Sequence, residues 1–208
     1  MIASEESTDV TVSIPGLSFS SIQSVTAGET KRIDLPSQAT LGDIVDTPTN
    51  LGIHVTSASQ KTITVYGQSQ RKKTTDSFLA IPSNSVGNEY LLTSWKTDPN
   101  SFGKSQAAII ATSPNTLVSL YLPGSTTPTP IQLAQGQAYQ WRLDAPGQDL
   151  TGARIVSNNP IAVLAGNSCG LVPTDEEACD YLVEQLTPTS TWGSRFLTTL
   201  TLSVIQVT

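Results

Sequence analysis

The sequence predicts an all-β, antiparallel protein with very little helix, arranged as two internally repeated halves that each resemble a β-sandwich. Ser, Thr, Gly and Pro are plentiful, and charged residues make up only 13% of the 208 residues. Short alternating or β-branched segments are separated by turn-forming residues. No segment shows a long 3.6-residue period, so we expect few and short helices.

The strands predicted in the first half alternate between apolar and polar residues or are rich in β-branched residues. Most of them end at a Pro or Gly, as Asp9–Ile14 does before Pro15-Gly16. The stretch Gln38–Asn50 is predicted to be a loop. The predicted strands are Asp9–Ile14, Ser18–Val25, Thr30–Leu35, Ile53–Thr56, Thr62–Tyr66, Asp76–Ile81 and Glu89–Trp95.

The second half shows the same alternation of strands and turns. Turn formers at Ser113–Asn115 and at Ser157–Pro160 predict two hairpins. Leu182–Leu186 is predicted to hold a helical turn, and Phe196–Val207 one or two strands. The remaining predicted strands are Gln106–Thr112, Thr116–Leu122, Ile131–Leu133, Ala138–Leu143, Ala153–Val156 and Ile161–Ala165.

The chain repeats itself with an offset of about 100 residues. Leu51–Ser57 matches Thr151–Ser157, and Ile63–Gly67 matches Ala162–Gly166. A repeat of this length has the size of one β-sandwich. We therefore expect one repeat in residues 1–100 and a second in residues 101–208.

The only two cysteines, Cys169 and Cys179, lie in the second repeat. A zinc site needs four ligands, and the only histidine, His54, is far away in sequence, so no metal or other cofactor is expected. The two thiols can form a disulfide or remain buried and free. We expect the disulfide, which would stabilise the fold by about 3 kcal/mol and implies an oxidising, extracellular compartment.

Charge and hydropathy exclude several classes of partner. The net charge of −6 disfavours a nucleic acid, because binding to phosphates needs a basic surface. No apolar run approaches the roughly 20 residues that cross a bilayer, so no membrane insertion is expected. The start of the chain lacks the basic and apolar regions of a signal peptide. A disulfide in a chain without a signal peptide suggests a mature fragment.

The stretch Leu150–Phe196 carries motifs of a known family, and several segments of the first repeat carry them too. In the second repeat they are Leu150–Gly152, Val156-Ser157, Pro160–Val163, Gly166-Asn167, Cys169, Val172-Pro173, Cys179-Asp180, Leu182–Leu186, Pro188 and Thr191–Gly193. In the first they are Thr11–Pro15, Ala27-Gly28, Val55–Ser57, Asp76–Pro82 and Gly87–Tyr90.

These motifs resemble the N-terminal domain of the IgGFc-binding protein family, large secreted proteins of mucus and related extracellular proteins. The resemblance implies a noncatalytic, secreted or cell-surface module that acts in protein binding or adhesion within a larger assembly. It implies a protein partner, either an immunoglobulin Fc or a neighbouring subunit of that assembly. The family provides no motif that assigns individual binding residues.

Two charged loops are candidate binding loops. The first is the basic triplet Arg71, Lys72 and Lys73, and the second is the acidic triplet Asp175, Glu176 and Glu177. Charged loops of this kind are more often solvated loop tips, and that is the alternative for each. The acidic triplet, together with Asp180, can also offer oxygen ligands to calcium, although its spacing does not match a calcium-binding EF-hand loop.

Two other function classes remain open from the sequence. Trp95, Trp141 and Trp192 can form a sugar-stacking platform if they lie on one face, which would make the chain a carbohydrate-binding module with a glycan partner; otherwise they are core residues. Ser168 lies in a Gly-x-Ser-x-Gly pattern typical of serine hydrolases. A Gly- and Pro-rich loop follows it instead of a helix, so the hydrolase is the remoter alternative.

Overall fold

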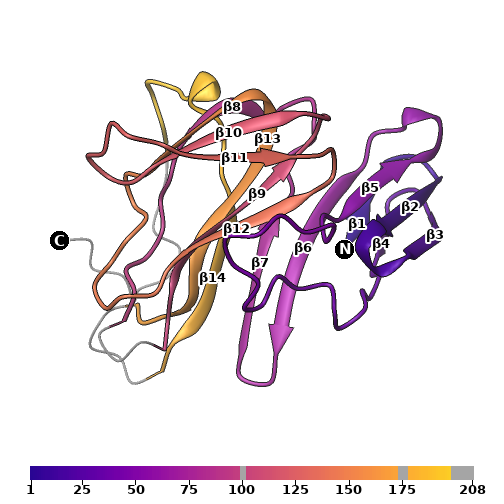
Figure 1. The fold of residues 1–208 in the computed structure, drawn as a ribbon. Helices are drawn as coiled ribbons and strands as arrows, with labels where there is room; N and C mark the ends of the chain where they lie inside the picture. The colour runs from indigo at the N-terminus through magenta and orange to yellow at the C-terminus, as the bar shows by residue number, and fades with distance from the viewer. Residues whose placement is uncertain (99–101, 173–177, 198–208) are drawn as a thin grey trace.

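The computed structural model describes residues 1–98, 102–172 and 178–197, and these residues form an all-β protein. Figure 1 shows a large body of strands on one side, a small one at the N-terminal end, and a long hairpin between them. No described residue is α-helical; the helical elements are single 3-10 turns, η1 (Pro15–Leu17), η2 (Ala58–Gln60) and η3 (Thr189–Thr191). The predicted fold class is confirmed.

The N-terminal part of the chain forms two small antiparallel sheets. Their shared core contains Val10, Val12 and Val25, each at most 3% exposed, because alternate side chains of a strand point to the same face. The first sheet has the order β3 (Phe19–Val25), β2 (Thr8–Ile14), β5 (His54–Ser57). The second has the order β4 (Thr30–Lys31), β1 (Ile2–Ala3), β6 (Thr64–Arg71), β7 (Thr74–Leu79).

The large body is a seven-stranded sheet folded around the 17-residue strand β13 (Arg154–Gly170). The first residues of β13 pair with β10 and β8, and the residues after Pro160 pair with β9 and β14. The other strands are β8 (Gly87–Leu91), β9 (Ser105–Ala111), β10 (Thr116–Tyr121), β11 (Thr129–Leu133), β12 (Ala138–Leu143) and β14 (Asp180–Gln185). Strands that turn a corner in this way join two layers into one sandwich-like core.

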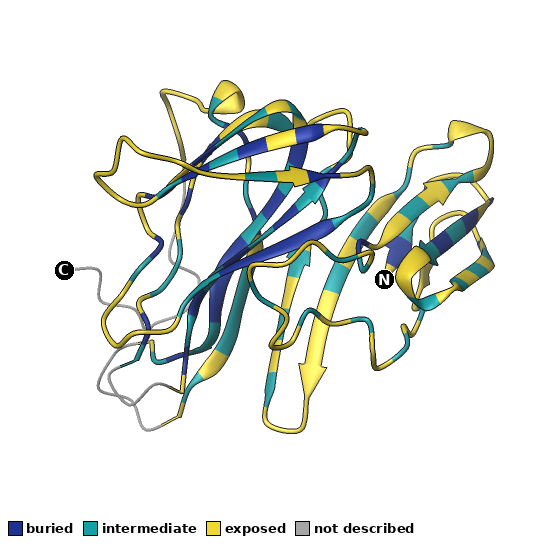
Figure 2. Ribbon diagram, viewed as in Figure 1, coloured by how far each residue is buried: buried dark blue, intermediate teal, exposed yellow. Residues whose placement is uncertain are grey.

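The core of this sandwich is continuous and apolar. Figure 2 shows the buried residues concentrated on the strands of the large body, whereas the hairpin β6–β7 is mostly exposed. Ile109, Ile155 and Ile161 are fully buried, as is Tyr90. The Tyr90 hydroxyl donates a hydrogen bond to the Ile161 carbonyl (2.7 Å) and accepts one from the Gly87 amide (2.9 Å), so its polar atom is satisfied inside the core.

The hairpin predicted at Ser157–Pro160 is wrong, because β13 runs through this stretch as one bent strand. The register with β8 shifts between Val156 and Ile161, which marks a bulge. The Asn158 side chain accepts a hydrogen bond from the Leu117 amide (2.8 Å). The side-chain amides of Asn158 and Asn159 donate to the Asn115 and Pro114 carbonyls (3.2 Å each), so these turn formers bind the neighbouring β9–β10 connection while the strand bends without reversing.

The hairpin predicted around Ser113–Asn115 is also wrong. The turn is present, but β9 pairs with β12 and β13, whereas β10 pairs with β11 and β13. The two strands therefore follow each other along the bent β13 and do not pair with one another.

Two further predictions concern the end of the chain. The helical turn predicted at Leu182–Leu186 is wrong, because Asp180–Gln185 forms strand β14. For Phe196–Val207, the structure places Phe196 and Leu197 outside any strand, and residues 198–208 lie outside the described residues.

The division into halves at residue 100 stays a prediction. Strand β8 precedes that boundary, and it pairs with β13 of the second half. The loop Gln38–Asn50 of the first half also contacts the second half. The amides of Asp46 and Thr49 donate hydrogen bonds to the Gln140 and Ala138 carbonyls of β12 (2.9 and 2.8 Å). The two parts of the chain thus share sheet edges.

Candidate functional site

The basic triplet lies at the tip of the β6–β7 hairpin. Arg71 pairs with Thr74, and Lys72 and Lys73 form the two-residue turn between them. All three basic residues are exposed. None of them takes part in an ion pair among the described residues, whereas other basic residues do.

Side chains of β7 cover the outer edge of β14. The Asp76 carboxylate accepts a hydrogen bond from the Val183 amide (2.7 Å), and the Thr74 hydroxyl accepts one from the Tyr181 amide (2.7 Å). These groups take the place of a backbone ladder, so the edge amides of β14 are satisfied without a paired strand. We call this contact the β7–β14 seam.

Asp180 links β14 to β7 at the end of the seam nearest the hairpin tip. Its carboxylate accepts hydrogen bonds from the Thr74 hydroxyl and from the Thr75 amide (3.2 Å). The hydrogen bond from Thr74 lowers the pKa of Asp180, although desolvation acts in the opposite direction. The structure therefore brings the basic tip close to the residue that follows Cys179.

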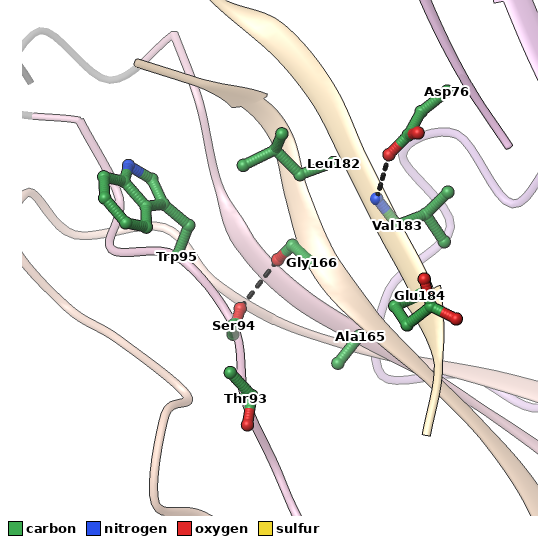
Figure 3. Close-up of a pocket in the computed structure, with 9 residues that line it drawn as sticks. All are labelled: Asp76, Thr93, Ser94, Trp95, Ala165, Gly166, Leu182, Val183 and Glu184. Carbon is green, nitrogen blue, oxygen red and sulfur yellow. Dashed lines mark hydrogen bonds between the residues drawn. The ribbon is translucent and has the colours of Figure 1, made fainter. Parts of the chain in front are cut away.

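A hollow of about 220 Å³ lies beside the seam, and Figure 3 shows its lining. Its lining includes Ser94, Trp95 and Leu182, together with the carboxylates of Asp76 and Glu184. The Ser94 hydroxyl donates to the Gly166 carbonyl (2.7 Å). Partial desolvation raises the pKa of Glu184, and the charge of Asp76 raises it further. The hollow thus combines an apolar wall with two carboxylates.

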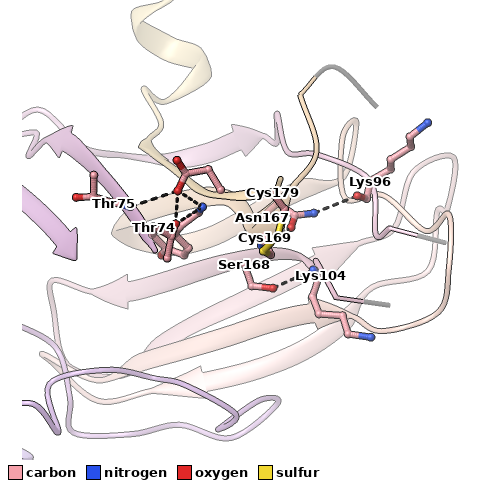
Figure 4. Close-up of a disulfide and its surroundings, with 10 residues drawn as sticks. Thr74, Thr75, Lys96, Lys104, Asn167, Ser168, Cys169 and Cys179 are labelled. Carbon is pink, nitrogen blue, oxygen red and sulfur yellow. Dashed lines mark hydrogen bonds between the residues drawn. A yellow bond between two sulfur atoms is a disulfide. The ribbon is translucent and has the colours of Figure 1, made fainter. Parts of the chain in front are cut away.

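The predicted disulfide joins Cys169 to Cys179, with 5.0 Å between the two Cα atoms. Figure 4 shows the polar network around it. The fully buried Asn167 donates to the Trp95 and Lys96 carbonyls (2.9 and 3.0 Å) and accepts from the Cys169 amide (2.8 Å). This amide side chain fixes the end of β13 that carries the disulfide.

A serine hydrolase at Ser168 would need a base, for which His54, the only histidine of the sequence, is the candidate; these two residues lie on different sheets. Ser168 belongs to β13, and its hydroxyl accepts a hydrogen bond from the Lys104 amide (2.9 Å). Ser168 lies within a strand, whereas the nucleophilic serine of hydrolases with this motif lies at a sharp strand-to-helix turn. His54 lies on β5 of the three-stranded N-terminal sheet, opposite Ser13. The described residues therefore do not bring Ser168 and His54 together as nucleophile and base.

The three tryptophans have different surroundings. Trp141 is only 9% exposed and belongs to the core, Trp95 lines the hollow, and Trp192 is 55% exposed next to η3. A buried ring cannot stack on a sugar from outside. Trp141 is therefore no part of a surface platform.

A second hollow of about 440 Å³ lies beside Tyr121 and Arg154. The Arg154 guanidinium lies 4.7 Å from the centre of the Tyr121 ring and 3.4 Å from the Glu89 carboxylate. Its charge is already matched by Glu89, so this hollow offers an anionic ligand little attraction.

The acidic triplet Asp175, Glu176 and Glu177 lies outside the described residues. Within the described residues, no group of three or more His, Cys, Asp or Glu side chains is arranged to hold a metal ion. The same part of the chain has no helix long and apolar enough to cross a membrane.

Sequence reasoning missed the groups that form the seam. Thr74, Asp76 and Asp180 bind the main chain of a partner segment more than 100 residues away. The one signal in the sequence is the repeat: continued beyond Ile63–Gly67 and Ala162–Gly166, it makes Gln68–Thr75 correspond to the loop that carries Cys169 and Cys179. The structure brings these two loops together.

Comparison with known proteins gives a consistent result. A family model described as "IgGFc binding protein" matches residues 76–204, which is more than half of the chain and includes strands β8 to β14. The Homo sapiens protein "IgGFc-binding protein" is 29% identical over 148 residues, which are 67% of this chain and 3% of the human protein. The chain thus spans a very small part of that relative. No solved structure matches the chain significantly.

Proposed function

This chain belongs to the IgGFc-binding protein family, and from that premise we propose that it is a noncatalytic, extracellular module that binds another protein. The observation that carries the proposal is the family match over residues 76–204, which includes strands β8 to β14 and the disulfide. A disulfide is typical of an oxidising compartment, which supports a secreted or cell-surface location.

The arrangement of the polar side chains supports a noncatalytic role. The Ser168 hydroxyl binds the Lys104 amide, and Asn167 binds three backbone groups. These groups stabilise the fold around the disulfide. Loops, a hairpin tip and strand edges remain as surface for a partner, and such surfaces are common sites of protein recognition.

The partner is a protein, either an immunoglobulin Fc or a neighbouring subunit of an adhesive extracellular assembly. Biolayer interferometry with the immobilised chain against IgG Fc, with Fab as the control, tests the first. A capture experiment from the native extracellular fluid, followed by mass spectrometry, tests the second. Saturable binding of Fc, or of one defined extracellular protein, supports the proposal. Absence of any saturable protein ligand would contradict it.

A carbohydrate-binding module is the second candidate, because Trp192 is 55% exposed. An exposed ring can stack on a sugar. A glycan array that gives a signal with the natural chain and none with Trp192→Ala would favour this candidate. The hydrolase candidate needs labelling of Ser168 by a fluorophosphonate probe, and we expect none.

A further inference from the structure

Strand β3 (Phe19–Val25) is the outer strand of the three-stranded N-terminal sheet. It pairs with β2, and no other strand of the described residues pairs with it. We call its unpaired side the β3 edge. Figure 1 shows β3 at the outer end of the small N-terminal body, away from the large body. The large body repeats this strand order as β11–β10–β13, with β11 as the outer strand. Since β2 precedes β3 and β4 follows it, the position of the edge is set by the internal order of the strands.

The β3 edge lacks the features by which proteins usually protect an open edge. Those features are charged residues, Pro, bulges and very short strands. β3 has seven residues, pairs with β2 without a register shift, and contains neither a charged residue nor Pro. Ile22 at its centre is 67% exposed, and Ser20 and Ser24 flank it on the same exposed face. Such an edge is suited to accept a further strand.

Other strand edges are shorter, covered or interrupted. β4 and β5 have only two and four residues. The loop at Thr49 covers β12, Asp76 of β7 binds the edge of β14, and the Thr189 hydroxyl donates to the Glu89 carbonyl of β8 (3.3 Å). β11, which has the corresponding place in the large body, contains Pro130. Among the described strands, β3 thus combines length with an unprotected edge.

The residues of β3 are arranged symmetrically about Ile22. When two copies of the strand pair antiparallel around a twofold axis, the register that pairs all seven residues is centred on Ile22. Paired side chains then lie on the same face of the joined sheet. Because no position is charged, no like charges face each other in this pairing. The opposed residues are Ile22 with Ile22, Ser20 with Ser24, Ser21 with Gln23, and Phe19 with Val25.

We propose that the β3 edge binds the β3 edge of a second copy of this chain, which joins the two three-stranded sheets into one continuous sheet. Main-chain hydrogen bonds hold the two strands together, and the pairing brings two exposed isoleucines into contact. The contact uses the β3 edges of both copies, so association stops at a dimer. The inference rests on the proposed function, and it names a second copy as one neighbouring subunit.

The contact is small, because seven residues on each copy bury less area than a standard protein–protein interface. We therefore expect weak association in solution, which becomes effective where an extracellular assembly holds copies close together. Covalent trapping is the more sensitive test of a contact of this kind.

Cysteine substitutions in the full chain test the register. Ile22→Cys places two cysteines opposite each other with about 4.5–5.5 Å between their Cα atoms, a separation that a disulfide bridges. Ser20→Cys is the matched control on the same exposed face. It places the cysteines about 14 Å apart, because Ser20 faces Ser24 of the second copy. In a glutathione redox buffer, we expect Ile22→Cys to form about tenfold more linked dimer than Ser20→Cys. Non-reducing electrophoresis measures the dimer, and mass spectrometry identifies the linked residues.

A charge at the centre of the β3 edge tests the association itself. Ile22→Lys places two ammonium groups opposite each other, and we expect the self-association constant from sedimentation equilibrium to fall about tenfold. The control Leu117→Lys makes the same change at an exposed residue of β10, which is an inner strand, and it should associate as the natural chain does. Circular dichroism and the thermal midpoint check that each variant is folded.

Two outcomes overturn the inference. They are equal cross-linking of Ile22→Cys and Ser20→Cys, and equal self-association of the natural chain and a folded Ile22→Lys. Failure here is separable from failure of the proposed function. If either outcome is found while Fc or an extracellular protein binds saturably, protein binding stands and the pairing of two β3 edges does not.

Discussion

Asn167 shows how one side chain organises the region around the disulfide. It is fully buried and binds the Trp95 and Lys96 carbonyls and the Cys169 amide. Buried polar groups that lose their partners keep the desolvation cost. The segment Trp95–Lys96 and the end of β13 therefore depend on this amide side chain.

We expect Asn167→Ala to lower the free energy of unfolding by about 3 kcal/mol, because three backbone groups lose a partner. Urea denaturation followed by tryptophan fluorescence measures the change. The exposed Asn84→Ala is the control and should change stability by less than about 0.5 kcal/mol. A loss below 1 kcal/mol for Asn167→Ala would show that water replaces the side chain.

The ionisation of Asp180 makes the stability that the seam contributes depend on pH. Its pKa is lowered from the ordinary value of 3.8, chiefly by the Thr74 hydroxyl. A lowered pKa in the folded state contributes stability above the unfolded-state pKa, and this stability is lost as pH falls through the folded-state value. We therefore expect natural-chain stability, relative to Asp180→Asn, to be greatest above pH 3.8 and to fade below it.

Urea midpoints of the natural chain and Asp180→Asn, measured from pH 6 to pH 2, check this expectation. Asn keeps the shape and one acceptor oxygen, so the comparison isolates the charge. A difference between the two proteins that stays constant over this range would contradict the assignment.

At the level of elements, the seam replaces a backbone ladder between β7 and β14. Asp76→Ala leaves the Val183 amide without its partner, and we expect a loss of about 1–2 kcal/mol in unfolding free energy. Hydrogen exchange at Val183 should become faster. The neighbouring exposed Ser77→Ala serves as the control, with little effect on either quantity. Unchanged exchange at Val183 in Asp76→Ala would show that the seam does not depend on this carboxylate.

The sequence predicted correctly those strands that are determined by the local pattern of apolar and polar residues. Alternation predicted β2 to within a residue at each end, because its buried face follows the period of two. It failed at Ser157–Pro160 and at Leu182–Leu186. In both places distant groups decide the conformation: Leu117 for the first, and the side chains of β7 for the second.

The candidate site was predicted only in part. The triplet Arg71–Lys73 was recognised as a loop between two strands, and the structure places it at a hairpin tip. The seam that Thr74 and Asp76 form with β14 could not be predicted, because it joins segments more than 100 residues apart. Local residue pattern does not contain such long-range contacts.

At the scale of the whole molecule, the disulfide closes a short loop beside the seam. Replacing both cysteines by Ser should lower the free energy of unfolding by about 3 kcal/mol, because the open chain gains conformational entropy. Urea denaturation measures this loss, and dithiothreitol should reproduce it in the natural chain and have no effect on the double variant. Equal stability of all three samples would show that the disulfide contributes nothing.

The whole chain presents strands, loops and edges from two connected bodies, with the β6–β7 hairpin between them (Figure 1). This arrangement leaves the hairpin tip exposed while its other edge is fixed by the seam. A hairpin that is fixed along one edge suits protein recognition, because little order has to be imposed on this side of an interface.

The most direct test of this account is to measure whether the chain binds a protein. Biolayer interferometry of the immobilised full chain against IgG Fc, and against a protein captured from the native extracellular fluid, reports saturable binding. The account predicts saturable binding of a defined protein ligand, and this binding should persist in Trp192→Ala. Absence of any saturable protein ligand, together with glycan binding that Trp192→Ala abolishes, would contradict it.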